Sequence, residues 1–200
     1  MKELVLYIPG RGGSAAESGH YAPLFPGCKV TGLDCRGATP WEAGEEIRSA
    51  MEKLHETYAG ITLIANSIGA FSSMWAGIDG LIDRAFFISP ILDLERLILD
   101  MMGWAHVTEE ELRDKGEIPT NFGETLSWEV LCRVRAHPVR WEAPTEVLYG
   151  SNDNLTTYET VSAFAEAHGA GLTVMEGGEH WFHTEEQMRF LDAWLREKTK

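Results

Sequence analysis

The feature that most constrains the fold is the stretch 61–70, whose sequence is ITLIANSIGA. Its first five residues are mostly apolar or β-branched, which is typical of a buried strand. Beyond it, apolar residues recur at the spacing of one helix face, at Phe71, Met74, Trp75 and Ile78. Ser67 stands between these two patterns among small residues. The stretch therefore predicts a strand, a sharp turn that carries a serine, and a helix.

This context is the one required of the G-x-S-x-G nucleophile elbow. The pentapeptide here is Ala65-Asn66-Ser67-Ile68-Gly69, so alanine replaces the first glycine. Small residues flank such a serine because the turn strains its backbone and brings strand and helix close together. Small-x-Ser-x-Gly also occurs at ordinary strand-to-helix connections, so the motif alone leaves both interpretations open.

Composition indicates a globular protein of one domain. The chain has 200 residues, of which 44% are hydrophobic and 24% charged. Its 17 basic and 31 acidic residues give a net charge of −14, which disfavours nucleic acid and anionic membrane surfaces as partners. The N-terminus runs straight into a short strand pattern, and no stretch approaches roughly 18 apolar residues, so we expect neither a signal peptide nor a membrane span.

The cysteines Cys28, Cys35 and Cys132 are odd in number and form no C-x-x-C motif. We therefore expect reduced thiols in a cytoplasmic protein.

Apolar runs alternate with helical patterns along most of the chain. The runs that predict strands are 4–8, 29–34, 61–65, 84–89, 145–149 and 172–175. Helical spacing of apolar residues marks the segments 43–58, 68–78, 161–168 and 190–195. This alternation predicts an α/β fold of about six mainly parallel strands, with helices on both faces of the sheet.

Residues 94–143 depart from the alternation. They contain no good strand pattern and are too many for a simple crossover between two sheet strands. We expect a helical cap inserted into a single domain of residues 1–200, over the carboxyl edge of the sheet, where open α/β sheets bind ligands. Its aromatic residues, Trp104 and Trp128 among them, either line an acyl pocket or form the core of the cap itself.

An acid and a histidine follow the last two predicted strands. Asp153 comes just after 145–149, and His180 lies in a glycine-rich loop just after 172–175. A serine needs a base to take its proton, and that base needs a third group to orient it. Ser67, Asp153 and His180 each fall on a loop at the carboxyl end of a strand, in the chain order of an α/β-hydrolase triad. Together these three loops are far more specific than any one of them.

On these residues the chain resembles the α/β-hydrolase superfamily over almost its whole length. The matching pieces are PGRGG at 9–13, ANSIG at 65–69, GSND at 150–153 and GEH at 178–180. The family usually has eight strands, so a chain with six resembles the small, trimmed bacterial hydrolases that lack the first two.

The resemblance also implies an oxyanion hole made by the backbone N–H groups of Ile68 and Arg11. Many members have a histidine where this chain has Pro9, and that departure bears on the Arg11 assignment. A plain turn is the alternative for the glycine loop, whereas phosphate binding is disfavoured because neither G-x-x-x-x-G-K-[ST] nor G-x-G-x-x-G is present.

Other residues are weaker candidates for catalytic, metal-binding or substrate-binding roles. Asp93 is an alternative to Asp153 as the acid, although a helix N-cap is its simpler role. The pattern Glu179-His180-x-x-His183 lacks the H-E-x-x-H order and a third ligand cluster, so we expect no metal. His20, near the glycine loop, is a substrate contact or a surface histidine, and the Arg11 side chain is a candidate for binding a substrate carboxylate.

The sequence thus predicts a serine hydrolase of carboxylesterase or thioesterase type. Ser67 would attack a small ester or thioester, His180 would relay the proton, and Asp153 would orient His180. Trp104, Trp128 and Trp181 are the candidate substrate-binding residues, and no cofactor is implied. The alternative is a non-catalytic ligand- or protein-binding member on the same scaffold. Whether the chain forms a homodimer stays open.

Overall fold

The computed structural model describes residues 3–200, and these divide into two compact units. The first, here called the sheet unit, consists of 3–92 and 140–200. The second, here called the inserted unit, is Asp93–Val139.

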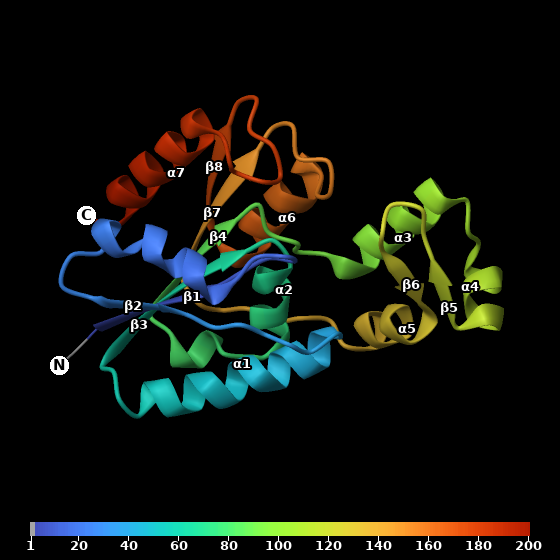
Figure 1. Ribbon diagram of the computed structural model, residues 1–200, viewed down its shortest axis with the longest axis horizontal. Helices are drawn as coiled ribbons and strands as arrows, with labels where there is room; N and C mark the ends of the chain where they lie inside the picture. The colour runs from blue at the N-terminus through green and yellow to red at the C-terminus, as the bar shows by residue number, and fades with distance from the viewer. Residues whose placement is uncertain (1–2) are drawn as a thin grey trace. The chain divides into compact units, whose positions relative to one another are not determined.

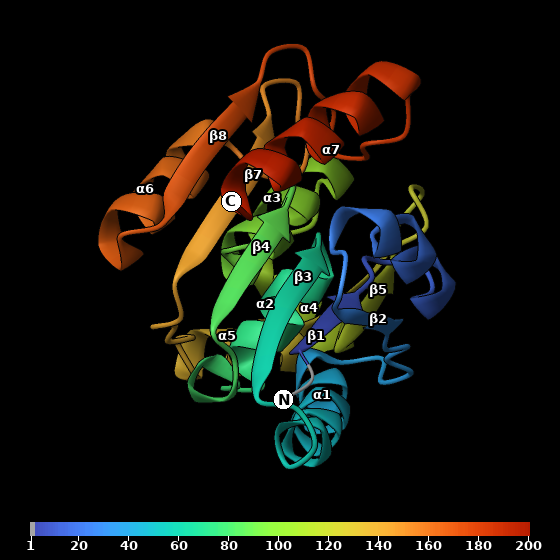
Figure 2. The ribbon, with the colours of Figure 1, turned by 90° about the vertical axis from the view of Figure 1, so that its left-hand side faces the viewer.

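A six-stranded sheet with the order β2-β1-β3-β4-β7-β8 forms the centre of the sheet unit, and all of its pairings are parallel (Figures 1 and 2). Its strands are β1 (Glu3–Ile8), β2 (Lys29–Gly32), β3 (Gly60–Asn66), β4 (Arg84–Ile88), β7 (Thr145–Gly150) and β8 (Gly171–Met175). The six strands predicted from apolar runs are therefore all present. Because the strands are parallel, their carboxyl ends meet at one edge of the sheet.

Helices cover both faces of this sheet, as the continuous apolar runs predict. Neighbouring residues of β4 show the two faces, because successive side chains of a strand point to opposite sides. Phe86 packs edge-on against Trp194 of α7 (Glu185–Lys198), with ring centroids 5.6 Å apart. Phe87 packs against Phe164 of α6 (Tyr158–His168) at 6.4 Å. Figure 1 shows α7 on one side of the sheet and both α1 (Pro40–His55) and α2 (Ile68–Trp75) on the other.

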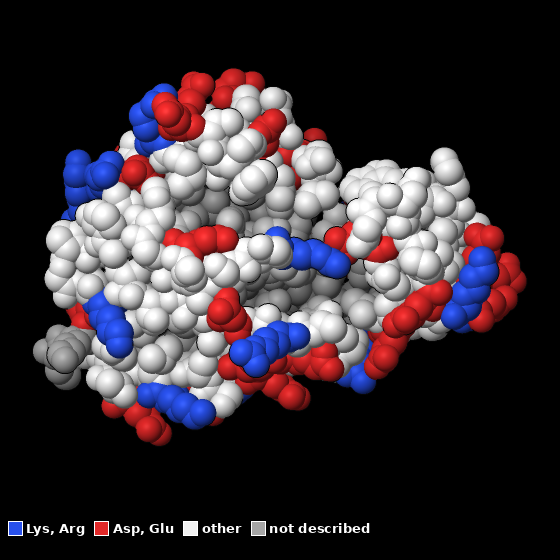
Figure 3. Space-filling model, in the orientation of Figure 1, with Lys and Arg blue, Asp and Glu red and all other residues white. Residues whose placement is uncertain are grey.

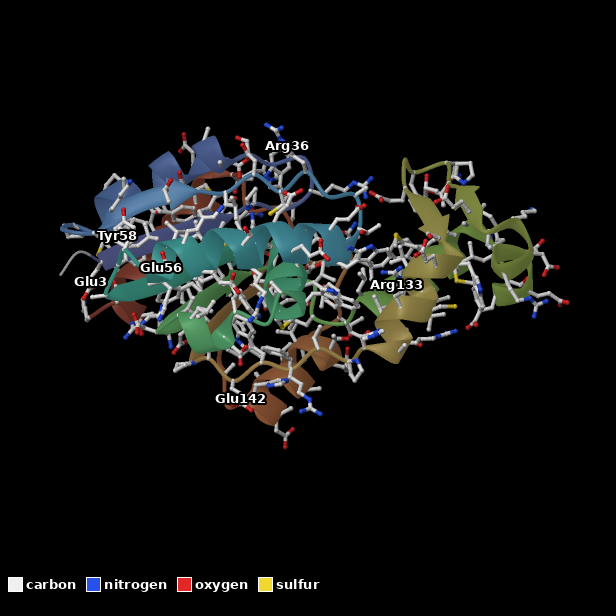
Figure 4. All side chains as sticks on the ribbon, turned by 90° about the horizontal axis from the view of Figure 1, so that it is seen from below. Glu3, Arg36, Glu56, Tyr58, Arg133 and Glu142 are labelled. Atoms are coloured by element: carbon white, nitrogen blue, oxygen red, sulfur yellow. The ribbon has the colours of Figure 1, made fainter. Side chains whose placement is uncertain are left out.

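Helix α1 begins where its sequence provides a capping box. The Thr39 side chain accepts a hydrogen bond from the Glu42 N–H, the Glu42 carboxylate accepts one from the Thr39 N–H, and Pro40 occupies the first turn. Ala43, Ile47 and Met51 form its buried face. The opposite face is polar, and acidic and basic side chains are interspersed along this edge of the molecule (Figure 3). Glu56 and Tyr58 follow the end of the helix (Figure 4).

Two 3₁₀ helices, Ala15–His20 and Ala22–Leu24, follow Ser14. Both pack on the α7 face, where Tyr21 and Leu24 join the buried core.

The inserted unit contains three helices and a small sheet. Its elements are α3 (Leu94–Ala105), α4 (Glu109–Lys115), β5 (Glu117–Pro119), β6 (Thr125–Ser127) and α5 (Trp128–Ala136). The antiparallel pair β5–β6 shows that the expectation of no strand in 94–143 was wrong. Each of these strands has three residues and only Leu126 is fully buried, so the sequence carries no alternating pattern long enough to detect.

One arginine joins the three helices of the inserted unit. Arg135 on α5 donates two hydrogen bonds to Glu109 on α4, at 2.6 and 2.7 Å, and one to Glu95 on α3 at 2.6 Å. Its guanidinium lowers the pKa of the Glu109 carboxyl. The unit therefore has its own polar framework beside its small apolar core. The role of a cap stays a prediction.

The residues that return the chain to β7 belong to the sheet unit. Trp141 is 2% exposed, packs on Phe87 at 5.4 Å, and donates a hydrogen bond to the Thr145 hydroxyl at 2.7 Å. This tryptophan is thus part of the sheet core, outside the inserted unit in which the sequence placed it.

Within residues 3–200, no helix is both long and apolar enough to cross a membrane. The three cysteines are free thiols.

We predict that Cys35 reacts far more slowly with iodoacetamide than the exposed Cys132. Burial, together with the Glu46 and Asp34 charges, raises the pKa of the Cys35 thiol to about 11. At pH 8 only about 0.1% of such a thiol is the reactive thiolate. A time course of alkylation, read by peptide mass spectrometry, checks this order, and equal rates at the two cysteines would contradict it.

Candidate active site

Ser67 lies on the turn between β3 and α2, where its backbone has φ 51° and ψ −122°. A non-glycine residue at positive φ is strained and persists only where its surroundings hold it. Here the Ser67 N–H donates to the Ile88 carbonyl at 3.0 Å, and the Ser67 carbonyl accepts from the Ile91 N–H at 3.1 Å. Both backbone groups of the serine are therefore fixed by the end of β4 and the turn that follows it.

Two glycines allow other parts of the chain to approach this turn. A Cβ on Gly69 would lie 2.6 Å from the Pro9 carbonyl oxygen and 2.8 Å from that of Ile8. A Cβ on Gly10 would lie 2.9 Å from the Cβ of Ser67. The glycine loop after β1 thus packs directly against the serine turn, with room for hydrogen only at these two positions.

Ser67, His180 and Asp153 form a continuous hydrogen-bonded chain. The Ser67 Oγ lies 2.8 Å from His180 Nε2, and His180 Nδ1 lies 2.7 Å from Asp153 Oδ2. A carboxylate only accepts, so His180 Nδ1 carries the proton and Nε2 is left to accept from the serine hydroxyl. The three residues follow β3, β8 and β7, whose carboxyl ends share one edge of the sheet.

The Asp153 side chain is 0% exposed, whereas that of His180 is 14% exposed. Burial of a carboxylate is costly unless its oxygens are hydrogen-bonded. Oδ1 of Asp153 accepts from the N–H groups of Leu155 at 2.8 Å and Thr156 at 3.0 Å, while Oδ2 faces His180. The acid is therefore held in one orientation, and its charge stabilises a positive charge that develops on His180.

The loops that carry the acid and the histidine are bound to each other through their backbones. A Cβ on Gly150 would lie 2.4 Å from the Gly178 carbonyl oxygen. The Asn152 N–H donates to that same carbonyl at 2.8 Å, and the Ser151 N–H donates to the Met175 carbonyl at 3.0 Å. Because residue 150 is glycine, the loops that follow β7 and β8 can lie in direct backbone contact.

The glycine loop after β1 forms a tight turn in which the Gly13 N–H donates to the Gly10 carbonyl at 3.1 Å. Arg11 and Gly12 are its central residues, and Gly12 has φ 76°, which favours glycine. Ile68 is the first residue of α2, so its N–H has no acceptor within the helix. The assignment of these two N–H groups to an oxyanion hole stays a prediction.

Tyr7 and Glu17, which the sequence did not single out, anchor the far end of this loop. The Tyr7 hydroxyl donates to Glu17 Oε2 at 2.6 Å, and the Ser14 N–H donates to Glu17 Oε1 at 3.0 Å. Burial, followed by the bond to Glu17, raises the pKa of Tyr7 well above its usual value, so the phenol stays protonated and donates. A capping-box pattern, Ser14-x-x-Glu17, was the available signal.

The alternative acid, Asp93, occupies a different position. It caps the N-terminus of α3 and accepts from the Arg96 N–H at 2.9 Å, whereas Asp153 bonds His180. His20 bonds Asp192 on α7 at 2.8 Å. His183 bonds the Trp181 carbonyl at 2.7 Å, and no group of three or more candidate metal ligands is found among residues 3–200.

The three candidate substrate-binding tryptophans lie in different places. Trp181, next to His180, is 69% exposed and stacks on His183 with ring centroids 4.2 Å apart. Trp104, 48% exposed, packs edge-on against Phe122, and Trp128 is the partly buried first residue of α5. Trp104 and Trp128 belong to the inserted unit, and the substrate role of all three stays a prediction.

An open groove of about 700 Å³ lies between the β2 side of the sheet and α1. Its lining includes no member of the triad; it consists of Leu6, Thr31, Gly32, Leu33, Glu45, Glu46, Ser49, Ala50, Lys53 and Leu54.

Structural comparison finds solved structures that are similar to this chain. Est1E from Butyrivibrio proteoclasticus, also solved with ferulic acid bound, has a TM-score of 0.79 at 17% identity, covering 99% of this chain and 87% of that one. The alpha/beta hydrolase domain-containing protein 10 from mouse has 0.71 at 14%, covering 98% and 89%. The RedJ thioesterase of prodiginine biosynthesis in Streptomyces coelicolor has 0.62 at 18%, covering 98% and 85%. No protein-family model and no curated protein sequence matches.

We predict that Gly69→Ala lowers the free energy of unfolding by about 1–3 kcal/mol. The new Cβ would meet two backbone oxygens, which cannot move aside as a side chain can. Gly80→Ala is the matched control, because a Cβ there has nothing within 4 Å. Urea unfolding of both variants checks the prediction, and equal midpoints for the two variants would contradict it.

Proposed function

We propose that this chain, which has the α/β-hydrolase fold, is a serine hydrolase that cleaves a small ester or thioester through an acyl-enzyme intermediate. The observation that carries the proposal is the hydrogen-bonded chain from the Ser67 hydroxyl through His180 to the buried Asp153 carboxylate. The strained backbone of Ser67 on the turn after a parallel strand gives further support.

In the proposed first half-reaction, the Ser67 Oγ attacks the substrate carbonyl while His180 Nε2 takes the hydroxyl proton. Asp153 stabilises the imidazolium that forms, and it stays ionised. When the tetrahedral intermediate collapses, the bond to the alcohol or thiol breaks and His180 gives its proton to that leaving group. In the second half, His180 takes a proton from water and the resulting hydroxide attacks the acyl-serine ester. The bond from the acyl carbon to Ser67 Oγ then breaks, His180 returns its proton to Oγ, and the acid leaves.

The N–H groups of Ile68 and Arg11 would stabilise the oxyanion in both half-reactions. Ile68 follows the nucleophile directly, and the loop of Arg11 packs on the Ser67 Cβ through Gly10. Each such donor is typically worth about 3 kcal/mol of transition-state stabilisation.

Est1E was solved with ferulic acid bound, and the RedJ protein is a thioesterase. We therefore propose an ester or thioester of a small acid as substrate, and an aromatic acyl group belongs among the compounds to test. A non-catalytic binding protein is the alternative, but no observation favours it, because all three triad residues are present and bonded to one another.

We predict that Ser67→Ala abolishes labelling by a fluorophosphonate probe and lowers turnover of p-nitrophenyl acetate by at least about 10⁴-fold. The substitution removes the attacking oxygen and leaves the backbone unchanged. Ser49→Ala, which changes an exposed serine on α1, is the control and should label like wild type.

Labelling of folded Ser67→Ala at the wild-type level would contradict the assignment of the nucleophile. A folded wild type that neither labels nor turns over any of a series of p-nitrophenyl esters, a feruloyl ester and an acyl thioester would favour the binding protein instead.

We also predict that Arg11→Ala keeps kcat for p-nitrophenyl acetate within about threefold of wild type, because the proposed role belongs to the backbone N–H, which alanine retains. A rise in KM confined to esters of dicarboxylic acids would show that the side chain binds a substrate carboxylate. A 100-fold loss of kcat on the neutral ester would contradict the backbone role.

A further inference from the structure

Thr156 follows the catalytic acid Asp153 by three residues. Its N–H, its hydroxyl and its carbonyl each form a hydrogen bond. It is 6% exposed, and its N–H donates to Asp153 Oδ1 at 3.0 Å. Its hydroxyl donates to the Pro90 carbonyl at 3.2 Å, and its own carbonyl accepts from the Tyr149 hydroxyl at 3.0 Å. A residue whose backbone N–H, backbone carbonyl and side-chain hydroxyl all form buried hydrogen bonds has little freedom to move.

The hydroxyl bond leads to the turn that holds the nucleophile. Pro90 lies between Ile88, whose carbonyl accepts from the Ser67 N–H, and Ile91, whose N–H donates to the Ser67 carbonyl. A continuous path therefore runs from the backbone of Ser67 through residues 88–91 to the Thr156 hydroxyl, and from the Thr156 N–H to the Asp153 carboxylate.

The turn in the middle of this path is itself constrained. Ser89 is 0% exposed and has φ 42°, a conformation that a non-glycine residue adopts only where it is held. Its N–H donates to the Leu148 carbonyl of β7 at 2.9 Å, which joins the turn to the strand that precedes Asp153. A displacement at either end of the path is therefore not easily absorbed in the turn.

Tyr149 of β7 donates a hydrogen bond to the carbonyl oxygen of Thr156. It is 3% exposed, and burial, with the charges of Asp153 and Glu159, raises the pKa of its phenol. The hydroxyl accordingly stays protonated at neutral pH and serves as a donor to the Thr156 carbonyl.

We propose that Thr156 is a positioning residue, which holds the Asp153 carboxylate at a fixed spacing from the Ser67 backbone so that His180 can bond both. The inference rests on the proposed hydrolase function. His180 spans its two partners with bonds of 2.8 and 2.7 Å, so a shift of the acid loop lengthens one of them. Catalytic geometry tolerates displacements of only about 0.5 Å before rate is lost.

The test compares two substitutions that separate the hydroxyl from the shape of the side chain. Thr156→Val keeps the shape and loses the hydroxyl, whereas Thr156→Ser keeps the hydroxyl and loses a methyl group. With p-nitrophenyl acetate we expect Thr156→Val to lower kcat by about 10- to 100-fold with KM within threefold, since Thr156 is buried and positions the acid without touching substrate. Thr156→Ser should stay within about threefold of wild-type kcat.

Tyr149→Phe provides a second variant that leaves Thr156 itself unchanged. It removes only the hydroxyl that donates to the Thr156 carbonyl, and we expect a loss of kcat of about three- to tenfold. This variant and Thr156→Ser decide the question if Thr156→Val does not fold, as judged by circular dichroism and urea unfolding. The rate of inactivation by the fluorophosphonate should fall in the same order as kcat.

Three results would overturn the proposal. One is a folded Thr156→Val or Tyr149→Phe with wild-type kcat, and another is a rise in KM at unchanged kcat. The third is an equal loss of kcat in Thr156→Val and Thr156→Ser, which would assign Thr156 to packing alone. Failure of the hydrolase function itself is a different result, because wild type would then neither label nor turn over.

Discussion

The backbone of Ser67 has a positive φ, which costs about 1–3 kcal/mol for a residue other than glycine, and the rest of the site depends on the contacts that hold it there. The end of β4 and the turn after it bind both of its polar backbone groups. Gly69 allows the first turn of α2 to pack against the end of β1, and Gly10 allows the loop after β1 to contact Ser67. As a result the hydroxyl stands at the carboxyl edge of the sheet, beyond the last residue of β3.

The rest of the site depends on how two more strand ends are brought to the same edge. Parallel pairing of β7 with β8 places the acid loop beside the histidine loop, and the close approach of Gly150 to Gly178 joins them. The buried Asp153 carboxylate then has a bond from His180 and two from backbone N–H groups. Its charge is available to the imidazole in surroundings of low dielectric, where it has more effect than at the surface.

Much of this could be predicted from the sequence, because its signals are local. Continuous apolar runs predicted the six strands of the sheet, and the chain order of Ser67, Asp153 and His180 on loops after three of them predicted the triad chemistry. The hairpin β5–β6 escaped prediction because three-residue strands show no period. The bond from Thr156 to Pro90 spans 66 residues, so no local pattern encodes it. The hydrogen bond from Tyr7 to Glu17 joins β1 to the 3₁₀ helix Ala15–His20, and only the capping box of that helix gave a local sign of it.

The proposed mechanism requires that Ser67 becomes covalently acylated during turnover. The most direct measurement is to mix the protein with p-nitrophenyl acetate, quench it with acid within the first turnover, and locate the added mass by intact-protein and peptide mass spectrometry. We expect one acetyl group for each chain, on Ser67, matched by a burst of one equivalent of p-nitrophenol. Turnover without an acyl group on Ser67, or with the group on another residue, would contradict the assignment of Ser67 as the nucleophile.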